Sequence, residues 1–258
     1  MQRAVFPVVA LALGVISVLG AAHLATRAPE SESQAAGPAP SRHSDVSSGA
    51  IARALAVVSP LRGLGDDGHA DVVRRVRDGE AGTYIGDILR ERDSSLARWP
   101  DRHGVPLTVW VQPKSSVQDF SSNYVDEVRS AFEEWGGVRL PIHFTFVDDS
   151  ADAEVHVNWI DHFNEPISGR TRWARDDDWV ITDANIILAV HHNKGEQLDG
   201  DAMRAMAMHE IGHLLGLDHT TDSLSIMAPK VRVRQLSDAD RATVQLIYAL
   251  PAGPIGGR

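Results

Sequence analysis

One short segment in the C-terminal part of the chain carries side chains whose types and spacing suit metal chemistry. His209 and His213 are four residues apart, so on a helix both imidazoles project from one face, one turn apart. Two ligands of a single metal ion need that arrangement. Glu210 is rotated by about 100° from His209 on the same helix. Its carboxylate can therefore reach a water molecule at the site without being a ligand itself.

A third histidine completes the set. Gly216 follows His213 by three residues, and glycine tolerates the positive φ that an abrupt helix reversal requires. After such a reversal, His219 can return as a third ligand. Three neutral imidazoles with an open fourth position are typical of a catalytic zinc site. The five fixed positions of this pattern would match by chance in about 10⁻⁴ of chains of this composition, so ordinary surface histidines explain it poorly.

The composition excludes several other kinds of chemistry. The chain has 258 residues, of which 35 are acidic and 25 basic, and its formal net charge is −10. This charge disfavours nucleic acid as a partner. The chain contains no cysteine, which excludes disulfides, thiolate zinc sites, iron–sulfur clusters and cysteine nucleophiles.

Residues 1–25 are typical of an export signal. Arg3 precedes an apolar run over residues 5–25, and small residues at 20–22 offer a cleavage site. The run is longer than the core of most signal peptides and is long enough to span a bilayer, so a retained membrane anchor is the alternative. We therefore expect an exported protein that is secreted, periplasmic or anchored at the outer face of the membrane.

The remaining chain divides into three parts. Residues 26–82 predict a low-complexity linker, with a pro-segment as the alternative, and residues 83–104 predict a helical lead-in. The catalytic domain is expected over residues 105–252. Its patterns predict strands over 107–111, 142–147, 154–160, 169–174 and 183–190, and helices over 121–135, 201–215 and 237–250. This order indicates an α+β fold with one mixed sheet flanked by helices.

The segment MHEIGHLLGLDHT, residues 208–220, resembles the metzincin signature H-E-x-x-H-x-x-G-x-x-H. Met227 follows His219 by eight residues, the spacing of the Met-turn in the matrixin branch, and LSDADRATVQLIY resembles the last matrixin helix. The resemblance covers about residues 105–250. It implies a twisted mixed sheet with an active-site helix, a Met-turn and a C-terminal helix, and the exported N-terminus favours a bacterial member.

The resemblance also implies roles for individual residues. His209, His213 and His219 would bind one zinc ion, Glu210 would be the general base and acid, and Met227 would form a hydrophobic floor. Asp240 would anchor the Met-turn, although its spacing from Ser237 equally predicts a capping box. Protein or peptide substrates would lie along an edge strand and a pocket, for which the candidate residues are Gly169, Arg170, Thr171 and Ala205.

The sequence departs from the matrixin pattern in two respects, and calcium binding is a separate question. Without cysteine, the inhibitory propeptide switch of vertebrate matrixins cannot operate. A second, structural zinc is not expected, because Asn185 stands where a ligand would be and the spacing is not reproduced by His156, His162, His191 and His192. Oxygen ligands for Ca²⁺ are available from Asp148, Asp149, Asp152 and Asp176–Asp178. They form no ordered loop motif, so solvated turns are favoured and calcium stays open.

The sequence thus predicts an exported zinc endopeptidase in which Glu210 assists the attack of water on a peptide bond. One alternative is a zinc-bearing peptide-binding protein that does not turn over. Another is a narrow processing protease tethered to the membrane by residues 5–25. Residues 26–104 either inhibit the enzyme or are a tether with a domain extension, and the candidates for capping the zinc are His69, Asp87 and Asp93. The oligomeric state is left open.

Overall fold

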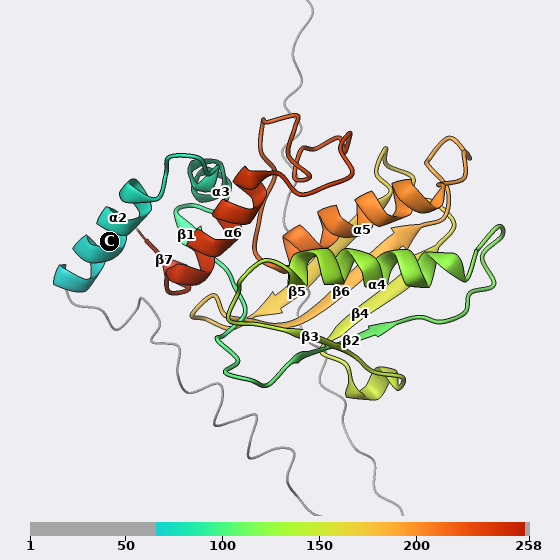
Figure 1. Ribbon diagram of the computed structural model, residues 1–258, viewed down its shortest axis with the longest axis horizontal. Coiled ribbons are helices and arrows are strands. Elements are labelled where there is room, and N and C mark those ends of the chain that lie inside the picture. Colours follow the sequence, from blue (N-terminus) through green and yellow to red (C-terminus); the bar gives the residue numbers. More distant parts are fainter. Residues whose placement is uncertain (1–65, 256–258) are drawn as a thin grey trace, which may run out of the picture. The chain divides into compact units, whose positions relative to one another are not determined.

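A five-stranded mixed sheet is the frame of the computed structural model, which describes residues 66–255 (Figure 1). Its strand order is β3–β2–β4–β6–β5, and the first four of these strands run parallel, whereas β5 is antiparallel to β6 and lies at the edge. The strands are β2 Leu107–Val111, β3 Phe144–Phe146, β4 Val155–Ile160, β5 Gly169–Arg175 and β6 Ile181–Ala189. The predicted α+β class is confirmed.

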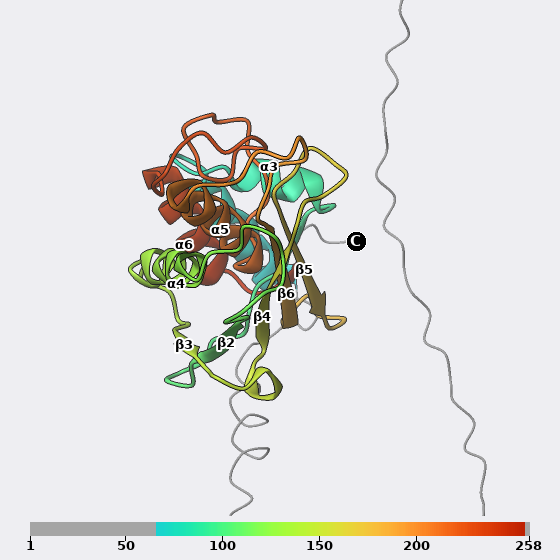
Figure 2. The same cartoon turned by 90° about the vertical axis from the view of Figure 1, so that its right-hand side faces the viewer.

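Two long helices, α4 (Asn123–Gly136) and α5 (Gly200–Leu214), lie side by side on one face of this sheet (Figure 2). The apolar face predicted for α4 is buried, including Val128, Phe132 and Trp135. The Trp135 indole Nε1–H donates to the carbonyl of Met208 in α5 at 2.9 Å. The sheet and α4 therefore hold α5 from two sides, and α5 is the helix that carries the histidines.

The elements that precede the five-stranded sheet in sequence pack against the C-terminal part of the described chain. They are α2 (Asp66–Asp78), α3 (Ile85–Glu91) and β1 (Ser95–Leu96). Strand β1 pairs antiparallel with β7 (Gly253–Pro254). Two further elements complete the chain, the 3₁₀ helix η3 (Ser150–Asp152) and the last helix, α6 (Asp238–Ala249), which directly precedes β7. The N-terminal elements are thus tied to the C-terminal part of the domain.

Two expectations for the N-terminal part need correction. The helical lead-in over 83–104 is helical only over α3, because Asp93 and Ser94 adopt φ values of 50° and 59° and turn the chain out of the helix. The end of the predicted linker over residues 26–82 contains the helix α2. There Val72 is buried, and the Arg75 guanidinium donates to the carbonyl of Ala249. Contacts with α6 therefore stabilise a helix that the local sequence does not favour.

The predictions for residues 1–65, including the export signal and most of the linker, fall outside the described residues. Within residues 66–255, no helix combines the length and the apolar character that a membrane crossing requires.

The buried carboxylate of Asp240 connects α6 to the turn that carries Met227. Asp240 is fully buried and accepts hydrogen bonds from the Ser225 hydroxyl, from the Ile226 N–H at 3.1 Å and from the Tyr84 hydroxyl at 3.0 Å. It also forms a reciprocal capping box with Ser237. The capping and anchoring roles considered for Asp240 therefore coexist in one carboxylate.

We predict that Asp240→Ala lowers the free energy of unfolding by about 3 kcal/mol, because several buried donors lose their acceptor at once. Urea unfolding of the purified protein measures this. Asp238→Ala is the matched control, since Asp238 is exposed in the same helical turn and contributes less than about 1 kcal/mol through the helix dipole. Equal losses in the two variants would contradict the anchoring role.

Candidate metal centre

Helix α5, which carries His209 and His213, ends in the sharp reversal that the sequence predicts. Its start is capped by Asp199, whose carboxylate accepts the Ala202 N–H at 2.7 Å. Its end is followed by Gly216, which has φ of +96°. A Cβ at Gly216 would lie 2.2 Å from the carbonyl oxygen of Ala97. Only glycine fits here, because both the backbone angle and the close approach of another segment exclude a side chain.

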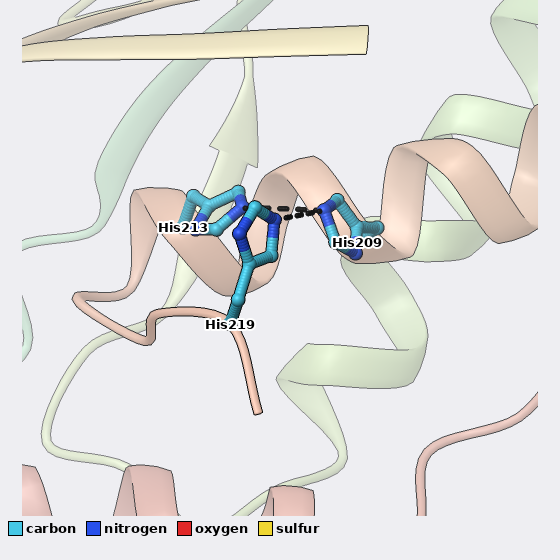
Figure 3. Close-up of side chains that lie close together, drawn as sticks. All are labelled: His209, His213 and His219. Atoms are coloured by element: carbon cyan, nitrogen blue, oxygen red, sulfur yellow. Dashed lines mark hydrogen bonds between the residues drawn. The ribbon is translucent and has the colours of Figure 1, made fainter. Parts of the chain in front are cut away.

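The reversal brings three imidazoles together (Figure 3). His209 and His213 come from consecutive turns of α5, and His219 comes from the loop that follows the helix. Their Nε2 atoms are 3.2 Å apart for His209 and His213, and 3.3 Å from His219 to each of the other two. Nitrogen ligands at about 2.0–2.1 Å from a tetrahedral zinc ion lie about 3.3 Å apart. The spacing therefore fits zinc.

Main-chain carbonyls orient the two helix histidines. The Nδ1–H of His209 donates to Ile226 at 2.7 Å, and that of His213 donates to Leu217 at 3.1 Å. These bonds leave the Nε2 lone pairs directed at the common point. Burial lowers the pKa of His209 to about 4 and that of His213 well below its usual value. Both rings are thus neutral, as metal ligands must be.

No other group of three or more histidine, aspartate or glutamate side chains within the described part of the chain has this convergence. His69, Asp87 and Asp93, considered as capping ligands, are not in the cluster. Asp87 instead accepts a hydrogen bond from the Thr220 hydroxyl at 2.9 Å. Three imidazole nitrogens that face one another are a chemically suitable set for zinc.

Glu210 lies between α5 and the edge strand β5. It is 3% exposed, and the Thr171 hydroxyl is 2.7 Å from its Oε2 and 2.9 Å from its backbone oxygen. Burial raises the pKa of Glu210 to about 7, and the hydrogen bond from Thr171 opposes that shift. A carboxyl group with a pKa near neutrality is suited to accept and return a proton.

Met227 packs beneath the metal-binding helix and is fully buried. A Cβ on Gly212 would lie 2.2 Å from the Met227 sulfur, so glycine within the helix is what allows this contact. Sequence reasoning missed Gly212, although an isolated glycine inside a helix signals close packing. It also missed the carbonyls of Leu217 and Ile226, for which the side chains give no signal.

The structure places the four candidate substrate-binding residues differently from one another. A Cβ on Gly169 would lie 2.4 Å from Oε1 of Glu210, so this glycine makes room for the carboxylate. Thr171 contacts the same group. Arg170 forms an ion pair with Glu165 at 3.0 Å. Ala205 is a buried residue of α5. Their roles in substrate binding stay predictions.

The other histidines and acidic residues take part in local contacts. His156 bonds the Ser150 carbonyl at 2.9 Å, and His162 bonds Asp161 at 2.7 Å. Ser168 lies 2.8 Å from His192. Asp149 caps η3, and Asp176 accepts the N–H groups of Asp178 and Val180 in a turn. These contacts give no support to a calcium site.

His191 is 8% exposed and links its own loop to two others. Its Nδ1 is 2.7 Å from Asp161 and its Nε2 is 3.1 Å from Asp119. Burial lowers the pKa of His191, but the hydrogen bonds and charges of the two carboxylates outweigh this and raise it above its usual value. The His191 imidazole therefore bridges the loop after β6 to the loops after β4 and β2.

We predict that Gly216→Ala destabilises the protein more than Gly195→Ala does. Both glycines have positive φ, at 96° and 86°, but nothing lies within 4 Å of a Cβ at Gly195. Both variants therefore pay the cost of about 1 kcal/mol for the left-handed backbone, and Gly216→Ala adds the collision with Ala97. Thermal unfolding of the two variants measures the difference. Equal unfolding temperatures would show that the close approach does not constrain the loop.

We predict that the stabilising effect of His191 depends on pH. Because its pKa is higher in the folded state, its contribution is complete below the unfolded-state pKa of about 6.5. It is lost as the pH rises through the folded-state value. His191→Asn should therefore lower the urea midpoint at pH 6 more than at pH 9, whereas the exposed His143→Asn should not. A loss for His191→Asn that is the same at both pH values would refute the charged bridge.

Comparison with known proteins agrees with this geometry. The sequence model of the matrixin family, peptidase family M10, matches residues 98–249. The chain is 28% identical over 224 residues to metalloendoproteinase 5-MMP of Arabidopsis thaliana, covering 74% of this chain and 57% of that protein. It is 24% identical over 220 residues to metalloendoproteinase 1-MMP of the same plant, covering 74% and 58%.

A human protein, matrix metalloproteinase-15, is 24% identical over 262 residues, which covers 84% of this chain and 37% of that protein. The chain thus spans little more than half the length of the plant relatives. The family match covers more than half of the chain and includes the histidine cluster, Glu210 and Met227. The chain belongs to the matrixin family of zinc metalloendopeptidases.

Proposed function

We propose that the protein is an exported zinc endopeptidase that hydrolyses peptide bonds with Glu210 as general base and general acid. The observation that carries this proposal is the convergence of three imidazole nitrogens at 3.2–3.3 Å. Beside them, a buried carboxyl group is held by Thr171. Together they provide a site for one metal ion and a proton acceptor, Glu210, on the helix that carries His209 and His213.

His209, His213 and His219 would hold the zinc ion. When bound there, zinc supplies a Lewis acid that makes water more acidic and polarises a substrate carbonyl. Glu210 takes a proton from the attacking water as the new C–O bond forms. It then delivers that proton to the amide nitrogen as the C–N bond breaks, so the carboxylate is regenerated. Thr171 keeps the carboxylate in one orientation through both transfers.

The edge strand β5 is where an extended substrate would bind. Edge strands offer main-chain groups on their outer side, and a peptide can add to them as a further strand. Glu210 packs against Gly169 and Thr171 at the start of β5, so a peptide bound along this strand passes close to the base. Arg170 and Ala205 are the remaining candidates for substrate contacts.

Export, by a cleaved signal or with a retained anchor, belongs to the same proposal and rests on the apolar sequence of residues 5–25. Protein or peptide substrates outside the cytoplasm would follow. A broad range of substrates would indicate a general protease, and a narrow range would indicate a processing enzyme.

We predict that Glu210→Ala lowers kcat for peptide cleavage by about 10²–10⁴-fold, the contribution of a general acid–base group, and leaves one zinc ion bound per chain. The full chain and the variant are incubated with a peptide mixture, new termini are identified by mass spectrometry, and zinc is measured by elemental analysis. Glu133→Ala on the exposed face of α4 is the control and should cleave normally.

Chelator-sensitive cleavage by the unmodified chain, with loss in the Glu210 variant alone, supports the proposal. Zinc binding without cleavage of any peptide or of casein would instead point to a peptide-binding protein, to a very narrow substrate range or to inhibition by residues 26–104. Loss of zinc from the Glu210 variant would show that this carboxylate is a ligand or a structural group.

A further inference from the structure

The loop between the second and third histidines is held by an arginine that comes from far earlier in the sequence. Arg92 lies at the C-terminal end of α3 and its side chain is 11% exposed. Its Nη1 donates to the Gly216 carbonyl at 2.8 Å and its Nη2 to the Leu217 carbonyl at 3.1 Å. Its Nε donates to the Asp218 carboxylate at 3.0 Å. Every nitrogen of the guanidinium therefore bonds to this one loop.

Two of these acceptors also hold the metal ligands. The Leu217 carbonyl accepts from Nδ1 of His213 as well as from Arg92. The Asp218 carboxylate accepts the backbone N–H of His219 through one oxygen, at 2.9 Å, and Arg92 through the other. Arg92 therefore contacts His213 through the Leu217 carbonyl and His219 through the Asp218 carboxylate. The planar guanidinium fixes these two acceptors relative to each other.

The guanidinium also connects the loop to the edge strand. Its central carbon lies 5.4 Å from the ring centroid of Trp173 in β5, within the range of a cation–π contact. Arg92 therefore lies between the metal-binding loop and the strand on which we place the substrate. Asp218 balances its charge in a setting where burial alone lowers the pKa of the guanidinium.

Neighbouring residues of the same N-terminal segment, residues 84–99, support the loop as well. Asp87 accepts from the Thr220 hydroxyl, directly after the third histidine. Trp99 donates from its indole nitrogen to the last-turn carbonyl of Leu214 at 3.0 Å. The carbonyl of Ala97 lies against Gly216. The segment thus forms one wall of the reversal, although the family match begins only at residue 98.

We propose that residues 84–99 are a permanent part of the metal centre, in which Arg92 is a positioning residue for His213 and His219. This inference rests on the proposed zinc site and adds to it. It also limits maturation, because a pro-segment that is removed from the active enzyme has to end before Tyr84.

Zinc affinity tests the role of Arg92 directly. The full chain, Arg92→Met, Arg92→Lys and the control Arg77→Met are compared by competition with a chromophoric chelator. Arg77 is exposed on α2, outside residues 84–99. Loss of a group that orients metal ligands weakens binding by about 10–100-fold, so Arg92→Met should lose that much and Arg77→Met nothing. Lysine keeps the charge without the fork and should recover part of the affinity.

The visible spectrum of the Co²⁺-substituted proteins separates positioning from general stability. We expect the ligand-field bands of the Arg92→Met protein to shift while its circular dichroism stays that of the folded chain. If Arg92→Met does not fold, the spectrum and the zinc affinity of Arg92→Lys show whether Arg92 positions the ligands. An unchanged zinc Kd and spectrum in a folded Arg92 variant would overturn the inference. If the unmodified chain bound no zinc, the proposed function would fail as well.

The termini of the processed protein test the limit on maturation. The full chain is incubated with zinc until it cleaves itself or is cleaved by trypsin, and the surviving zinc-bound species is sequenced from its N-terminus. We expect every such species to begin at or before Tyr84. A species that starts after Arg92 and keeps its zinc and its activity would overturn the proposal.

Discussion

The chain reversal at Gly216 is the constraint on which the metal centre depends. A helix supplies two ligands at i and i+4 from its own geometry, but the third must come from a chain that turns back within a few residues. Here the turn requires a left-handed residue and the close approach of the Ala97 carbonyl. The segment that contains Ala97 is therefore as necessary to the site as the helix, and its position is set by β1, β7 and α6.

A second consequence follows for the stability of the site. Neutral imidazoles and a carboxyl group of raised pKa are buried close together, which is unfavourable unless each group has partners. The partners are the Ile226 and Leu217 carbonyls and the Thr171 hydroxyl. Asp240 in turn fixes Ile226 through its N–H. Segments distant in sequence thus share the task of orienting the side chains of His209, His213 and Glu210.

The sequence predicted the local features well because they depend on local spacing. Helical periodicity placed α4, alternation placed β3 and β4, and Ser237 with Asp240 gave the capping box. It did not predict the contacts of Arg92 with Asp218, which are 126 positions apart, because a single arginine carries no pattern. It also missed α2, whose stability comes from packing on α6, and the break at Asp93, which interrupts an otherwise helical run.

In the proposed site, three histidines bind one zinc ion and leave a fourth position open. X-ray absorption spectroscopy at the zinc edge, on the full chain at one equivalent of zinc, measures this coordination. We expect three imidazole nitrogens and one further oxygen or nitrogen neighbour at about 2.0–2.1 Å, with the outer scattering of three rings. Fewer than three imidazoles, or a shell closed by four protein side chains, would contradict it.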